Sequence, residues 1–231
     1  MPVSPDENLQ KILDDAMPGQ VIELTEGDFR AKILLRTPSI TLRGSKAAKT
    51  RIIWDDYAKK TDEQGREYNT FRTWTMAVCA DDVTMTDLSI INDALCPEHK
   101  GQEVALTVYG DRFFMERCTL TSTQDTLFLG PLPTDLIKRY DGFLPDYLRG
   151  DRICRQHFHD CLIEGTVDFI FGCGEAFFEN CEIRSLRDAR DIGYVAAPAH
   201  ARSQDRGFLF QNCRMTAQSG VTPGSIFLAR P

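Results

Sequence analysis

A short repeated pattern constrains the fold of this chain more than any other feature of its sequence. Each copy has an aromatic residue, one or two polar residues, a cysteine and, two positions after the cysteine, an apolar residue. The copies are Phe114–Leu120, Phe158–Ile163, Phe178–Ile183 and Phe210–Met215. Their cysteines, at 118, 161, 181 and 213, suit coils of roughly 20 residues with extra residues looped out of some turns. Such a coil cannot bury its inner face alone, so the repeat predicts stacked coils, as in a parallel β-helix.

Short β-rich runs fill the chain from Val21 onward, separated by Gly, Asp, Asn and Pro. The clearest runs are Val21–Leu24, Ile33–Leu35, Ile40–Leu42, Arg51–Ile53, Val83–Met85 and Leu88–Ile91. Few of them are spaced for tight hairpins, which favours stacked coils and an all-β fold. A jelly roll or β-sandwich is the alternative, because short strands with polar turns are common to both architectures.

One amphipathic helix is expected at the start of the chain. Ser4 is the predicted N-cap, Pro5 suits the first helical position, and Glu7 completes a capping box. Apolar residues follow at helical spacing, at Leu9, Ile12, Leu13 and Ala16. The helix should end near Pro18. A single helix before so many strands predicts a cap over the end of the β-helix.

The composition excludes several classes of function. The 231 residues are 42% hydrophobic and 26% charged, which is ordinary for one globular domain spanning residues 1–231. A net charge of −7 argues against a nucleic acid partner, which calls for a basic face. No apolar run approaches the roughly 18 residues that span a membrane, so no membrane association is expected. The first ten residues, MPVSPDENLQ, show no secretory leader, which predicts a cytoplasmic protein unless a leader has been removed.

The eight cysteines are expected to be free thiols, mostly buried as small apolar groups. The chain is too long for a disulfide-stapled miniprotein, and it contains no Cys-x-x-Cys pair. His157 and His159 stand two apart on an expected strand and would point the same way, but packing or surface histidines are commoner than metal ligands. No Cys/His set has zinc spacing, so we expect no metal and no cofactor.

A single carboxylate in an apolar stretch is the strongest chemical signal. Asp168 stands in Gly165-Thr-Val-Asp-Phe-Ile-Phe-Gly172. Removing water from a carboxylate costs several kcal/mol unless a cation and hydrogen-bond donors replace the water. Asp168 is therefore predicted to be paired and functional, with a structural Asp that ties down a turn as the alternative.

Four motifs in order resemble those of the pectin methylesterases, which hydrolyse the methyl esters of polygalacturonate. They are Gln102-Glu-Val-Ala-Leu106, Gln124-Asp-Thr-Leu127, Gly165–Gly172 and Leu228-Ala-Arg-Pro231. The resemblance runs from about Leu9 to Pro231, and Gly130–Pro133 and Gly193–Pro198 resemble the bacterial branch of the family. It implies a right-handed parallel β-helix, in agreement with the repeat.

The resemblance also implies a role for each matching residue. Asp168 matches the nucleophile, and Asp125 matches the general acid that protonates methanol and then acts as base. Gln102 and Gln124 match the amides that stabilise the oxyanion, and Arg230 matches the cation that orients the nucleophile. The chemistry agrees with this division, because an adjacent guanidinium keeps a nucleophilic carboxylate ionised and positioned. The second carboxyl must carry a proton at the start, and burial and a like charge both raise a carboxyl pKa.

Substrate contacts are predicted at three further residues and one loop. The resemblance favours Phe169 over Phe171 as the ring that faces substrate. Tyr194 and Arg155 are predicted to border the groove, with a purely structural role as the alternative. Residues 130–153 interrupt the repeat with several Pro and Gly, and a loop of this length near the site is expected to wall the groove.

The chain departs from the family pattern in its last motif. Ala229 replaces the usual Gly, which would be strained if the position needs a positive φ. Cys173-Gly174 stands where the family often has Asn-Ala. The sequence stops directly after Arg230-Pro231, so we expect a C-terminally truncated domain in which Arg230 is poorly held.

The sequence thus predicts a monomeric carboxylic-ester hydrolase acting on methyl-esterified galacturonan or oligogalacturonides. A non-catalytic β-helix that binds pectic chains, or an inactive truncated relative, is the main alternative. A polygalacturonase or pectate lyase on the same fold is a further one, although the hydrolase motifs Asn-Thr-Asp and Gly-His-Gly are absent from the sequence.

Overall fold

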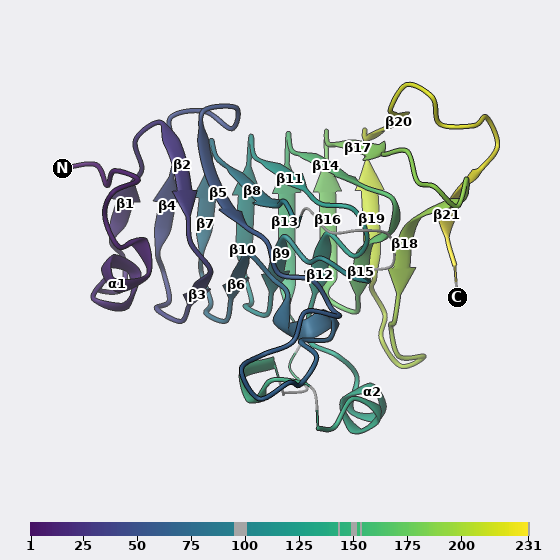
Figure 1. The fold of residues 1–231 in the computed structure, drawn as a ribbon, viewed down its shortest axis with the longest axis horizontal. Coiled ribbons are helices and arrows are strands. Elements are labelled where there is room, and N and C mark those ends of the chain that lie inside the picture. The colour runs from purple at the N-terminus through teal and green to yellow at the C-terminus, as the bar shows by residue number, and fades with distance from the viewer. Residues whose placement is uncertain (95–100, 143, 149–151, 153, 231) are drawn as a thin grey trace.

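The chain winds into a parallel β-helix whose coils stack in sequence order from the N-terminal to the C-terminal end (Figure 1). The computed structural model describes residues 1–94, 101–142, 144–148, 152 and 154–230. Each coil gives one strand to each of three sheets, and each sheet has seven strands within the described residues. All strand pairs in these sheets are parallel, which confirms the predicted fold and makes the jelly-roll alternative wrong.

Within each sheet the strands lie side by side in the order in which the coils stack. Sheet 1 contains β1 (Val21–Glu23), β4 (Thr41–Arg43), β7 (Thr84–Thr86), β10 (Phe113–Glu116), β13 (Arg155–His159), β16 (Glu175–Glu179) and β19 (Phe208–Gln211). Sheet 2 contains β2 (Gly27–Arg30), β5 (Thr50–Trp54), β8 (Ser89–Asn92), β11 (Thr119–Thr121), β14 (Leu162–Gly165), β17 (Glu182–Ser185) and β20 (Arg214–Ala217). Sheet 3 contains β3 (Ile33–Leu35), β6 (Met76–Val78), β9 (Leu106–Val108), β12 (Leu127–Leu129), β15 (Val167–Gly172), β18 (Gly193–Pro198) and β21 (Ile226–Ala229). The six strands expected from sequence are present, with ends that differ by at most one residue.

The helical elements are short. They are α1 (Leu9–Asp14), α2 (Thr134–Arg139) and the 3-10 turns η1 (Thr70–Arg72) and η2 (Asp146–Leu148). Among the described residues, no helix is long and apolar enough to span a bilayer.

The N-terminal helix does cap the first coil, but it begins later than the sequence suggested. Asn8, not Ser4, is the N-cap, and its side chain accepts a hydrogen bond from the Lys11 N–H. Ser4 and Glu7 still bond to each other, through Ser4 N–H and the Glu7 carboxylate at 2.7 Å, but they close a turn before the helix. The Gln10 side chain then pairs with both the N–H and the carbonyl of Leu34 on β3, an edge strand of sheet 3. The helix therefore satisfies backbone groups that an open edge would leave unpaired.

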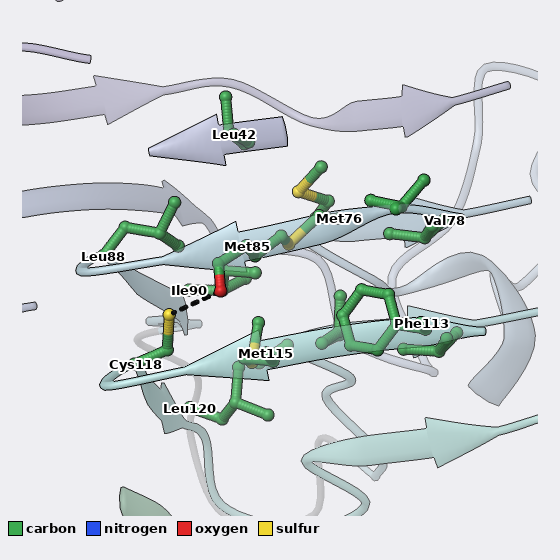
Figure 2. Close-up of a cluster of buried hydrophobic side chains, with 14 of the residues drawn as sticks. Leu42, Met76, Val78, Met85, Leu88, Ile90, Phe113, Met115, Cys118 and Leu120 are labelled. Carbon is green, nitrogen blue, oxygen red and sulfur yellow. Dashed lines mark hydrogen bonds between the residues drawn. The ribbon is translucent and has the colours of Figure 1, made fainter. Parts of the chain in front are cut away.

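The core consists of side chains stacked in register from coil to coil. Figure 2 shows part of it around Met85, Ile90 and Met115. Phe158 pairs with Phe178, and Phe178 with Phe210, with ring centroids 5.0 and 4.8 Å apart. The predicted alignment of the first copy of the repeat is wrong by one residue, because Met115 and not Phe114 pairs with Phe158.

The cysteines of the repeat form a second ladder at the turn between sheets 1 and 2. The Cys161 thiol donates to the Met115 carbonyl at 3.5 Å, and Cys118 donates likewise to the preceding coil (Figure 2). Burial raises the pKa of Cys118 to about 12, so this thiol is unreactive at neutral pH. All seven cysteines in the described part of the chain are free, as expected, and Cys96 lies outside it.

Candidate active site

A groove of about 520 Å³ lies on the outer side of sheet 3. Asp125 and Asp168 both line it, and so do Gln102, Gln124 and Arg230. All five predicted catalytic residues therefore meet in one place, although they come from widely separated parts of the sequence. The further lining residues belong mostly to two segments that leave the β-helix, residues 58–71 and residues 132–140.

The register of sheet 3 brings the two carboxylates together. Leu127 pairs with Ile170, so Asp125 and Asp168, each two residues earlier, occupy the same position in successive coils. Both have a left-handed backbone, with φ of 65° and 52°. Aspartate tolerates this conformation better than most residues. The pairing of β15 with β18 also shifts register between Val167 and Ile170, which marks the Asp168 position as irregular within an otherwise regular sheet.

Asp168 is buried and ion-paired. Its side chain is 7% exposed, and both of its oxygens accept hydrogen bonds from the Arg230 guanidinium. The bond from Arg230 Nε to Asp168 Oδ1 is 2.8 Å long. This two-point contact fixes the plane of the carboxylate as well as its charge.

Arg230 is held more firmly than the sequence led us to expect. Its N–H donates to the Ala196 carbonyl at 3.2 Å, and its guanidinium lies 5.5 Å from the centre of the Tyr194 ring. The ion pair with Asp168 also raises the pKa of Arg230. Tyr194 in turn stacks on Phe227, so it contributes to the site by supporting Arg230.

Asp125 is the carboxyl group whose neutral form is favoured by burial. It is 7% exposed, and its Oδ1 has no hydrogen-bond partner among the described residues. Loss of solvent and then the Asp168 charge raise the pKa of Asp125 well above its ordinary value. A hydrogen bond from Gln124 and the charges of Arg230 and Arg190 oppose this rise only in part. The groove thus combines an ion-paired carboxylate with a second carboxyl group whose neutral form is favoured.

The two glutamines are positioned by neighbouring coils. The Gln124 carbonyl accepts from the Glu103 N–H at 3.0 Å, and the Gln102 carbonyl accepts from the Ala58 N–H at 2.9 Å. Arg190, which sequence reasoning missed, donates from Nη1 to Gln124 Oε1 at 3.3 Å. Arg190 is itself held by Asp188 through two bonds of 2.7 Å. Because Gln124 Oε1 accepts from Arg190, only its NH₂ group, which also donates to Asp125, can donate to a ligand.

Two of the predicted substrate contacts are wrong. Phe169 is fully buried in the core, and the ring that lines the groove is Phe171. Arg155 lies on the outer face of sheet 1, where its guanidinium binds Asp111 at 2.9 Å beside a separate groove of about 800 Å³. It therefore does not border the two-aspartate groove.

The predicted loop 130–153 contributes to the groove through its first half. Leu132, Leu136 and Tyr140 line the groove, the last two from or next to α2. Positions 143, 149–151 and 153 of this loop lie outside the described residues.

The two histidines weighed as metal ligands have other partners. His157 pairs with Glu179 and His159 with Glu116, each at 3.1 Å. No group of three or more potential metal ligands occurs in the described ranges.

Fold and groove together define a parallel β-helix protein with a two-aspartate site on sheet 3. The pectinesterase family profile matches residues 5–131 and 147–231, and the chain belongs to this family. It is 29% identical to pectinesterase QRT1 of Arabidopsis thaliana over 98% of its length and 52% of that protein. The structure of pectin methylesterase PemA from Erwinia chrysanthemi matches with a TM-score of 0.79 and 27% identity, over 94% of this chain and 63% of that one.

A pectin methylesterase solved in complex with a hexasaccharide matches with a TM-score of 0.83 and 26% identity, over 97% of this chain and 66% of that one. The chain spans about half the length of the curated relatives it matches. The chain is about as identical to the plant protein as to the bacterial one. Its resemblance to the bacterial branch of the family therefore stays a prediction.

Proposed function

We propose that this chain hydrolyses the methyl esters of galacturonate units in pectin or its oligomers, releasing methanol. The observation that carries the proposal is the pairing of an Arg230-bound Asp168 with a buried, protonatable Asp125 in one groove. Two carboxyl groups with different protonation preferences are what a two-step ester hydrolysis needs. Membership of the pectinesterase family supports the choice of ester.

In the first step, a carboxylate oxygen of Asp168 attacks the ester carbonyl carbon. The carbonyl oxygen becomes an oxyanion, which the side-chain amides of Gln102 and Gln124 stabilise. As the ester C–O bond breaks, Asp125 gives its proton to the departing methoxide and methanol leaves. The product is an anhydride between Asp168 and the galacturonate.

In the second step, Asp125 is a carboxylate and takes a proton from water as the water oxygen attacks the anhydride. The bond to Asp168 breaks, galacturonate is released as a free acid, and Asp168 returns to its pair with Arg230. Asp125 is protonated again, so both groups regain their starting states.

Sugar-chain binding is supported by the hexasaccharide complexes of similar pectin methylesterases. The groove offers Phe171 and Tyr140 as apolar surfaces, with Lys59 near its rim as a cation. We propose methyl-esterified oligogalacturonides as the ligand.

Methanol release from methylated pectin by the purified chain tests the proposal. The wild type should release methanol, and Asp168→Asn should reduce turnover by at least about 10³-fold, as loss of a catalytic nucleophile does. Asp205→Asn, at an exposed position away from the groove, is the matched control and should keep full activity. A fully active Asp168→Asn protein would refute the nucleophile assignment. Galacturonan binding without any methanol release by the wild type would favour the non-catalytic alternative.

A further inference from the structure

One wall of the groove has little secondary structure to hold it in place. Residues 55–73 leave sheet 2 at the end of β5 and return before β6 in sheet 3. Their only regular structure is η1 and an isolated bridge between Thr61 and Glu67. The wall nevertheless supplies a large part of the groove lining: Ala58, Lys59, Glu67, Asn69, Thr70 and Phe71. Backbone hydrogen bonds from Tyr68 N–H to the Lys60 carbonyl and from Asn69 N–H to the Ala58 carbonyl, both 2.8 Å, join the two arms of the wall. Side-chain contacts must fix its two ends, which lie outside any helix or strand.

Asp56 anchors the start of the wall. It is 2% exposed, and its carboxylate accepts hydrogen bonds from Lys32 Nζ at 2.5 Å, Lys60 Nζ at 2.6 Å and Trp54 Nε1 at 2.9 Å. These three donors, two of them cations, compensate for the water that Asp56 has lost. A buried carboxylate with this many partners has essentially one possible position.

Lys32 joins the start of the wall to its end. Besides Asp56, its Nζ donates to the Arg72 carbonyl at 2.6 Å. The ammonium group also lies 5.0 Å from the centre of the Tyr68 ring and 4.7 Å from that of Trp74. Burial lowers the pKa of Lys32, and the Asp56 charge opposes that change. Lys32 therefore holds both ends of the wall, because its ammonium group binds Asp56 near one end and the Arg72 carbonyl near the other.

Asn92 joins the wall to the segment that contains Gln102 and Val104. Asn92 is 3% exposed, and its Nδ2 lies 2.9 Å from the carbonyls of Asp56 and Thr73 and 3.1 Å from that of Val104. The wall also contacts Gln102 directly, because the Ala58 N–H donates to the Gln102 carbonyl. Gln102 itself is in neither a helix nor a strand. Its own carbonyl is thus held by the wall, whereas the next residue, Glu103, bonds to the Gln124 carbonyl of the following coil.

We propose that Lys32, Asp56 and Asn92 form a positioning network that fixes the Gln102 amide in the oxyanion site. The inference rests on the proposed function, in which Gln102 stabilises the oxyanion. None of the three residues lines the groove, so they act through Gln102 and the wall and are positioning residues. An oxyanion donor works only when it is already in place before the reaction, and a displacement of about 1 Å can lower the rate by about 100-fold.

A double-mutant cycle in methanol release tests this coupling. Lys32→Met removes the ammonium but keeps an unbranched apolar side chain. We expect kcat to fall by about 10- to 100-fold with a much smaller change in KM. Gln102→Ala should cost about 10²–10³-fold in kcat. In the Gln102→Ala background, Lys32→Met should lower kcat no further, because the group it positions is gone. Lys46→Met, at an exposed lysine between β4 and β5, is the matched control and should change neither constant.

Additive effects of Lys32→Met and Gln102→Ala on kcat would overturn the proposal. Lys60→Met is the milder variant if Lys32→Met does not fold, since it removes one donor to Asp56 from a more exposed position. Lys60→Met should lower kcat less than Lys32→Met does. In the Gln102→Ala background it, too, should lower kcat no further.

Amide hydrogen exchange tests the network independently of enzyme activity. In Lys32→Met, amides of residues 56–60 and 101–105 should exchange at least about tenfold faster while those of the core strands stay unchanged. Unchanged exchange in both segments would overturn the network even if the enzyme is active. A wild type that releases no methanol would contradict the proposed function alone, because the exchange result would still decide whether the network holds Gln102.

Discussion

Replacing Asp125 by Asn measures how strongly the groove opposes a second negative charge. Burial and the neighbouring Asp168 raise the pKa of Asp125 in the folded protein. In the unfolded chain this carboxyl titrates near its ordinary value of about 3.9. Between the two pKa values the folded state binds more protons, so the free energy of unfolding falls as pH rises through that window. Above the folded-state pKa the full cost of the buried charge is present.

The size of the effect follows from the size of the pKa change. Each tenfold change in the acid dissociation constant corresponds to about 1.4 kcal/mol. Asn has similar volume and cannot ionise, so the variant does not lose stability in this window. We expect Asp125→Asn and wild type to be similarly stable near pH 4, and the variant to be more stable at pH 8, by about 1.4 kcal/mol for each tenfold change in the acid dissociation constant. In a chain of this length each such step raises Tm by about 3–6 °C.

Urea unfolding at a series of pH values is the appropriate assay, with Asp205→Asn as a control that should show no pH-dependent difference. The same Asp125→Asn protein should be inactive in methanol release, since it cannot donate the proton. A stability difference that is constant from pH 4 to pH 8 would refute the conclusion that this carboxyl is favoured as the neutral acid.

Two further predictions concern neighbouring residues. Arg230→Lys should lower kcat by about 10- to 100-fold while the protein stays folded, because a lysine cannot contact both Asp168 oxygens from one plane; unchanged kcat would show that charge alone suffices. Phe169→Ala should cost about 3–5 kcal/mol in the free energy of unfolding, because its ring is fully buried. Phe171→Ala should instead raise KM with a smaller loss of stability, and the reverse pattern in denaturant titrations and steady-state kinetics would contradict the placement of the two rings.

The sequence contained enough information for the fold because in-register stacking leaves a visible repeat. The one misaligned copy has a specific cause. In three copies the phenylalanine stands three positions before the cysteine, but Phe114 stands four before Cys118. Met115 has the correct offset and the correct register, and an apolar interior position accepts Met as well as Phe. Matching by residue type instead of by offset therefore selected the outward-facing neighbour.

The five residues that meet in the groove could be predicted from motifs, whereas their surroundings could not. Strand alternation does not hold around Asp168, because a positive φ and a register shift follow one another there. Which of Phe169 and Phe171 faces the groove therefore depends on backbone geometry that sequence does not reveal. Arg155 was misplaced for a different reason. The sequence does not reveal to which of the three sheets an outward-facing residue belongs. Arg190 had a local signal in Asp188 two residues before it, but nothing in sequence linked that pair to Gln124.

The register that builds the core also explains why the acid pair exists at all. Asp125 and Asp168 are separated by the same interval as Cys118 and Cys161, so both pairs are one coil apart. Stacking at a strand spacing of about 4.8 Å favours like side chains when they are apolar and penalises them when they are charged. The chain relieves the penalty by pairing one carboxylate with Arg230 and by favouring the neutral form of the other. Because described extra residues of this coil, such as those of α2, leave the β-helix between β12 and β13, this loop can vary in length without changing the register that places the two carboxyl groups together.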